Sequence, residues 1–115
     1  GGVYEGGIKV PGIFHFPARI RGGRVSDTPI WFPDVLPTVA TMAGAVVPAD
    51  LALDGIDLAP LLTKGSEPER AQPLMWYFYR SSPEVAMRYG DYNLIARSSD
   101  DTPRTHPIVA KTCPS

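Results

Sequence analysis

Proline is the feature of this sequence that most limits what it can fold into. Thirteen of its 115 residues are proline, roughly twice the usual share of about 5%. Because proline interrupts helices and central strands, we expect short elements joined by many loops. A chain of this length forms one domain or a piece of a larger one. It begins with Gly1 rather than Met, and we therefore expect a fragment.

Charge and cysteine content exclude several classes of function. The net charge is -1 with no basic stripe, which argues against nucleic acid and anionic membranes as partners. No apolar run approaches the ~18 residues of a membrane span, so none is expected. The single cysteine, Cys113, rules out an internal disulfide framework and a multi-cysteine metal site.

The first half of the chain has an α/β pattern. A Gly-rich corner at residues 1–7 leads into an apolar run at residues 8–16, which predicts a strand covered on both faces. Residues 33–43 predict a helix that begins near Pro33 and ends before Gly44. Its apolar positions recur at helical spacing and form one face: Val35, Leu36, Val39, Met42 and Ala43. A short helical turn is expected at residues 59–62.

The second half changes to a β pattern. Residues 74–79 predict an aromatic strand, and residues 85–89 and 92–95 predict a hairpin around Gly90-Asp91. The tail, residues 96–115, is expected to be loop or disorder, with a short strand at residues 107–110. We therefore predict three parts: the C-terminal part of an α/β domain (1–63), a linker (64–73) and an antiparallel subdomain (74–115).

Few residues are candidates for a site. Tyr4 and Glu5 lie in the Gly-rich corner, where α/β proteins often place binding loops; their alternative role is to fix that corner by hydrogen bonds. His15 lies inside an apolar run and is better explained as a hydrogen-bonded core residue than as a catalyst. Asp54 and Asp57 could approach a hard cation, but an Asp-Gly turn with a solvated Asp57 is the favoured interpretation.

The remaining candidates carry no recognisable chemistry. His106 lies in the Pro-rich tail, Asp100-Asp101 is most simply a polar turn, and Cys113 has no base nearby in the sequence. G-x-S-x-G, H-E-x-x-H, C-x-x-C and P-loop patterns do not occur. The residues by themselves therefore assign no catalytic set and no metal site.

An ordered string of four motifs resembles the formylglycine-dependent sulfatases (arylsulfatases). The matching segments are YEGGIKVPG at 4–12, DVLPT at 34–38 with the helix end at Ala43-Gly44, LDGIDLAPLL at 53–62, and MRYGDYNLI at 87–95. They occur in the order and at the spacing of the family. The resemblance implies an alkaline-phosphatase-like α/β fold, of which this chain would supply one central strand, a helix and the small C-terminal sheet.

The resemblance also implies a parent enzyme that hydrolyses sulfate esters. It would use a formylglycine made from Cys or Ser in C/S-x-P-x-R, a calcium ion held by Asp and Asn, and sulfate-binding Lys and His. We place none of these residues in this chain: C-x-P-x-R does not occur, and Cys113-Pro114-Ser115 does not match it. The family's lysine corresponds to the position immediately before Gly1, and Lys9 stands where the family usually has Arg. The D-P-x-E stretch that follows the family's hairpin is also absent.

The main hypothesis is thus a C-terminal sulfatase segment without catalytic or metal-binding residues of its own, inactive alone, with Tyr4 and Glu5 near the substrate of the parent. One alternative is a non-catalytic binding module, or one that self-associates through exposed strand edges. Another is a phosphodiesterase or phosphatase of the same superfamily. From the family, an exported, periplasmic or lysosomal location is expected.

Overall fold

The computed structural model describes residues 3–79, 83–97 and 111–112. The chain divides into two compact units, each described by itself. The helical unit contains residues 12–71, and the sheet unit combines the residues before Gly12 with those after Ala71. The expectations for Asp100-Asp101, His106, the strand at 107–110 and Cys113 fall outside the described residues.

The helical unit is built on α2. A 3-10 turn, η1 (Phe32–Asp34), runs directly into α2 (Val35–Ala43), so the helix predicted over residues 33–43 is confirmed. Pro33 and Pro37 fall near its start, where amides have no partner inside the helix. Gly44 adopts φ 73°, and the amides of Gly44 and Ala45 reach back to the carbonyls of Thr41 and Ala40.

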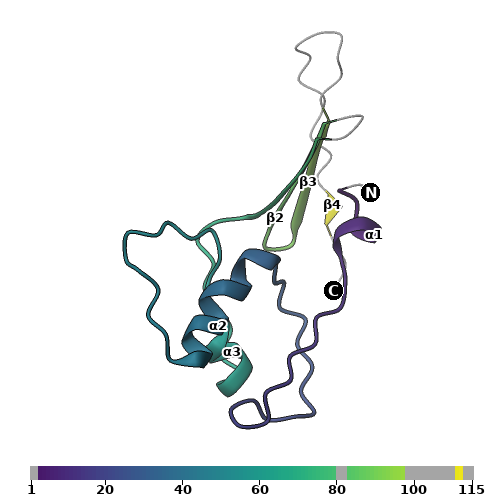
Figure 1. The fold of residues 1–115 in the computed structure, drawn as a ribbon. Helices are drawn as coiled ribbons and strands as arrows, with labels where there is room; N and C mark the ends of the chain where they lie inside the picture. Colours follow the sequence, from purple (N-terminus) through teal and green to yellow (C-terminus); the bar gives the residue numbers. More distant parts are fainter. Residues whose placement is uncertain (1–2, 80–82, 98–110, 113–115) are drawn as a thin grey trace. The chain divides into compact units, whose positions relative to one another are not determined.

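A second short helix, α3 (Ala59–Lys64), packs against α2 (Figure 1). Its start is fixed by the Asp57 carboxylate, whose Oδ1 accepts the amide of Ala59 at 2.8 Å. Its end is closed by Gly65 at φ 77°, and the Arg24 guanidinium donates to the carbonyls of Leu61 and Leu62 at 2.9 and 3.1 Å. The predicted helical turn is confirmed, and it is longer than expected.

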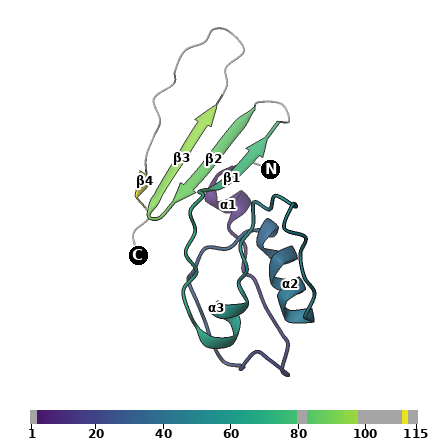
Figure 2. The ribbon, with the colours of Figure 1, turned by 90° about the vertical axis from the view of Figure 1, so that its left-hand side faces the viewer.

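The sheet unit contains an antiparallel meander. Its strands are β1 (Leu74–Phe78), β2 (Glu84–Tyr89), β3 (Tyr92–Arg97) and the two-residue β4 (Lys111–Thr112), in that order across the sheet (Figure 2). The hairpin is confirmed: Tyr89 pairs with Tyr92, and Gly90 takes the positive φ, 56°, that a two-residue turn needs. Trp76 pairs with Ala86.

Burial alternates along these strands. Leu74 and Ala86 are buried, whereas Met75 and Tyr77 are exposed, as expected for a strand whose successive side chains point to opposite faces. One face of the sheet is therefore covered, and the other presents Met75, Tyr77, Tyr89 and Tyr92 to solvent.

The predicted strand at residues 8–16 is wrong for this chain. Ile8 ends a single helical turn, α1 (Glu5–Ile8), and residues 9–16 have no regular secondary structure. Ile13 is 92% exposed. A strand exists only with a hydrogen-bonded neighbour, and the described residues provide none for this run.

Candidate functional site

Within the Gly-rich corner, the predicted substrate-proximal residues lie at a single helical turn. The Tyr4 carbonyl accepts the amides of Gly7 and Ile8 at 2.7 and 3.2 Å, and Glu5 begins α1. The Tyr4 side chain is 55% exposed. Because Gly6 and Gly7 are helical, they do not use positive φ here. The assignment of Tyr4 and Glu5 to a substrate site stays a prediction.

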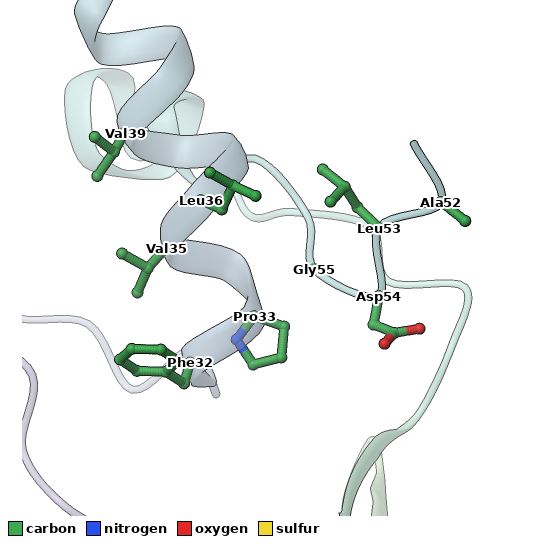
Figure 3. A pocket seen from close by; sticks show the side chains of 9 residues that line it. All are labelled: Phe32, Pro33, Val35, Leu36, Val39, Ala52, Leu53, Asp54 and Gly55. Carbon is green, nitrogen blue, oxygen red and sulfur yellow. The ribbon is translucent and has the colours of Figure 1, made fainter. Parts of the chain in front are cut away.

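The other candidate site residues of the helical unit, His15, Asp54 and Asp57, differ in burial and in bonding. His15 is exposed rather than held in a core. Asp54 is exposed, and its carboxylate points away from α2 (Figure 3). Asp57 is half-buried and caps α3, so it is not the solvated residue that was expected. Within the described ranges, no three His, Cys, Asp or Glu residues gather in a way that could hold a metal ion.

The most tightly organised polar group is one that the sequence did not single out. We call it the Asp34 cluster: Asp34, Thr38 and Arg70. The Asp34 carboxylate is fully buried and forms a two-pronged ion pair with Arg70, with Nη2 to Oδ2 at 2.6 Å and Nη1 to Oδ1 at 3.1 Å. The same oxygens accept the amides of Ile56 and Trp31 at 2.9 and 3.1 Å.

Thr38 extends the cluster by one turn of α2. Its hydroxyl donates to the Asp34 carbonyl at 2.6 Å and accepts the amide of Leu58 at 2.9 Å. The cluster therefore ties α2 to the loop before α3. A buried carboxylate is tolerated only when paired and hydrogen-bonded, and all of its bonding capacity goes to this chain's own groups. The Asp34 cluster is a structural joint and is not available to a ligand.

Gly55 allows this joint to close. A Cβ at this position would lie 2.0 Å from the Pro33 oxygen and 2.6 Å from the Asp34 nitrogen. The loop backbone thus runs directly against the start of the helix. The Asp54-Gly55 pair serves this close approach, which accounts for the motif without a metal ion.

Two open grooves flank α2. The first has a volume of about 460 Å³ and is lined by Phe32, Pro33, Val35, Leu36, Val39, Ala52, Leu53, Asp54 and Gly55 (Figure 3). The second, of about 310 Å³, lies along Phe14, Phe16, Met42 and Leu62 and also includes Val35 and Val39. Both grooves are mainly apolar, a lining that suits packing against another apolar surface better than acid–base chemistry.

No family model matches the chain, but curated proteins do. Human arylsulfatase D is 37% identical over 113 residues, which is 97% of this chain and 19% of that protein. Human arylsulfatase H is 43% identical over 112 residues, 97% of this chain and 20% of the relative. Human steryl-sulfatase is 37% identical over 112 residues, 96% of this chain and 19% of the relative.

These relatives identify the class as sulfatases. This chain belongs to the sulfatase family, in which arylsulfatases and a steryl-sulfatase match nearly all of its length. It spans about a fifth of the length of the curated relatives it matches. In the part of the chain that the structure describes, no helix has the length and apolar character needed to cross a membrane.

Proposed function

We propose that this chain is the C-terminal segment of a sulfatase whose complete form hydrolyses sulfate esters, and that the segment alone is inactive. The observation that carries the proposal is the extent of the match: 34–43% identity along 96–98% of the chain, against 18–20% of the relatives' length. Nearly all of this chain aligns with a small share of each relative, as expected for a segment that contributes structure to a larger α/β domain of alkaline-phosphatase-like fold.

The chemistry of the described residues supports the proposal that the segment alone is inactive. The sequence contains no C-x-P-x-R motif, and its S-x-P-x-R match, Ser66 to Arg70, follows α3. Arg70 is held there by the buried Asp34 carboxylate, so we assign this match a structural role and not that of a formylglycine precursor. The described carboxylates are exposed, used as a helix cap or closed within the Asp34 cluster, or they lie in the sheet unit, where the structure shows no metal-binding group. Within residues 3–79, 83–97 and 111–112, the side chains do not fit a calcium site.

Tyr4 and Glu5 are proposed to lie beside the substrate in the complete protein. In the isolated chain the Tyr4 side chain is exposed, which is compatible with a rim position. We propose the same domain limits as above, with residues 1–63 in the α/β domain and 74–115 in the C-terminal subdomain.

The first experiment assays the purified chain with an aryl sulfate, 4-methylumbelliferyl sulfate, with and without calcium. No turnover above a boiled control is expected. Calcium-dependent turnover that survives repeated purification would refute the claim of inactivity.

The second experiment tests the sulfatase assignment itself by reading the coding sequence upstream of Gly1. A C/S-x-P-x-R motif and paired Asp residues are expected there. An upstream Thr or Ser nucleophile outside that motif would replace the sulfatase proposal with a phosphoryl-transfer enzyme.

A further inference from the structure

The face of α2 opposite the Asp34 cluster is apolar, yet the chain leaves it uncovered. Val35, Leu36 and Val39 are 39%, 54% and 58% exposed. The buried residues of the helix are Pro37 and Thr38. In an ordinary surface helix the apolar stripe faces the core and the polar side faces water. Here the arrangement is reversed along the same nine residues.

This uncovered face continues into a larger surface. Val35 and Val39 line both grooves, so they form a ridge with a hollow on each side. Phe32 and Leu53 border the first hollow (Figure 3), and Phe14 and Phe16 border the second. We call this combination the α2 ridge: Phe14, Phe16, Phe32, Val35, Leu36 and Val39. A ridge between two hollows is the shape by which helices interlock with neighbouring elements.

A second observation points to an absent neighbour. Residues 8–16 have the near-continuous apolar composition of a strand buried on both faces, but residues 9–16 form no strand in this chain. Phe14 and Phe16 belong both to that run and to the α2 ridge. The sequence of this run is therefore typical of a buried segment, although the described residues leave Phe14 and Phe16 exposed to solvent.

We propose that the α2 ridge is the docking surface for the part of the same sulfatase that this chain does not contain. This inference rests on the proposed function and names the partner of that segment. The relatives extend over about five times the matched length, so most of the apolar surface that could cover the ridge lies outside the chain. The covering elements are apolar, because the two hollows are lined almost entirely by apolar side chains.

A small-molecule site fits the ridge less well. Ligand pockets usually contain a few convergent polar groups. The titratable groups along the hollows are Asp54, whose carboxylate points away from α2, and His15, which lines the second hollow. A second copy of this chain is the remaining occupant, and the experiment includes it as an outcome.

The test measures whether the ridge becomes covered. Cys113 is first replaced by Ser, and a single cysteine is introduced at Val39 on the ridge or, as the matched control, at exposed Thr41 on the same helix. Thiol labelling rates are compared in the isolated chain and in a chimera in which the chain replaces the aligned region of human arylsulfatase D. In the isolated chain both cysteines are expected to react at similar rates.

In the chimera, the Val39→Cys thiol is expected to react at least tenfold more slowly than in the isolated chain, while the Thr41→Cys thiol changes less than threefold. Equal labelling of Val39→Cys in both proteins would overturn the proposal. Protection of Val39→Cys in the isolated chain that increases with concentration would also overturn it and would make a second copy the occupant.

A second format guards against a chimera that does not fold. The remainder of arylsulfatase D and this chain are co-expressed as separate polypeptides, and their co-purification is measured. Wild type and Thr41→Glu are expected to co-purify, and Val39→Glu to lose at least nine-tenths of the association. Co-purification of Val39→Glu at the wild-type level, or of no variant, would refute docking through the ridge.

Activity provides a separate readout, so the two proposals can fail independently. A protected ridge in a chimera with no aryl sulfate turnover would count against the proposed function and leave the docking surface standing. Turnover with a ridge that stays fully reactive would support the sulfatase assignment and refute the docking surface.

Discussion

The two faces of α2 differ in what stabilises them. On one face, Asp34 and Thr38 are buried, and their polar groups are bonded within this chain to the half-buried Arg70 and to backbone groups. On the other face, Val35, Leu36 and Val39 remain in contact with water. The polar face thus carries the internal stability of the helical unit, and the apolar face is left for a partner. The comparison predicts that substitutions on the two faces have very different effects on the isolated chain.

The largest effect is expected for Asp34→Ala. The change removes a buried acceptor of four hydrogen bonds and leaves Arg70 without its partner, at a cost of about 3–5 kcal/mol in the free energy of unfolding. Urea denaturation followed by tryptophan fluorescence measures this cost. Asp27→Ala, at an exposed position, is the control and should change stability by less than about 0.5 kcal/mol. A loss below 1 kcal/mol for Asp34→Ala would contradict the idea that the Asp34 cluster stabilises the helical unit.

Gly55→Ala is expected to come next. Its methyl group would overlap the Pro33 carbonyl, and backbone cannot move aside as a flexible side chain can. Displacing the loop costs about 3 kcal/mol and weakens the Ile56 bond to Asp34. The control is Gly22→Ala, because a Cβ at Gly22 meets nothing within 4 Å. Equal unfolding midpoints for the two variants would contradict the close approach.

Thr38→Val tests the outer part of the cluster. The substitution keeps the shape of the side chain but leaves the buried amide of Leu58 without its acceptor, which costs about 1–3 kcal/mol. Thr41→Val, at an exposed position of the same helix, serves as the control. If both variants lose the same stability, helix propensity rather than the hydrogen bond explains the result.

The smallest effect is expected on the apolar face. Leu36→Gln exchanges one exposed side chain for another, so the isolated chain should change by no more than about 0.5 kcal/mol. Leu61→Ala, which truncates a buried side chain, should lose about 2–5 kcal/mol. A loss above 1.5 kcal/mol for Leu36→Gln would mean that this chain covers its own apolar face, and the contrast between the faces would disappear.

Local signals predicted much of the fold. The helix was predictable because Pro33 and Gly44 mark its ends. The hairpin was predictable because Gly90 and Asp91 form a two-residue turn that joins the paired strands. Both features depend on conformational preferences of neighbouring residues. The prediction of a strand at residues 8–16 failed for the opposite reason. The hydrogen bonds of such a strand would have to come from residues that are distant in sequence or absent from the chain.

The Asp34 cluster shows the same limit for side chains. In the sequence, Asp34 stood out only as the first residue of the DVLPT motif, and nothing in the local sequence reveals that it is buried. Its Asp-to-Thr spacing of four residues was a usable signal, because those positions share a helix face. The partner Arg70 lies 36 residues away, and no pattern in one sequence connects them. Gly55 likewise appears in the sequence as a turn residue, and its closeness to Pro33 emerges only in three dimensions.

The span of these bonds has a consequence for how the helical unit folds. Asp34 bonds to groups 22 and 36 residues along the chain, and Arg24 reaches carbonyls 37 and 38 residues away. The helices can form locally, but the joint closes only after long loops have been brought together, at an entropic cost. Despite its helices, this unit should therefore fold more slowly than a helical bundle of the same size. During synthesis, the Asp34 carboxylate remains without its counter-charge until Arg70 has left the ribosome.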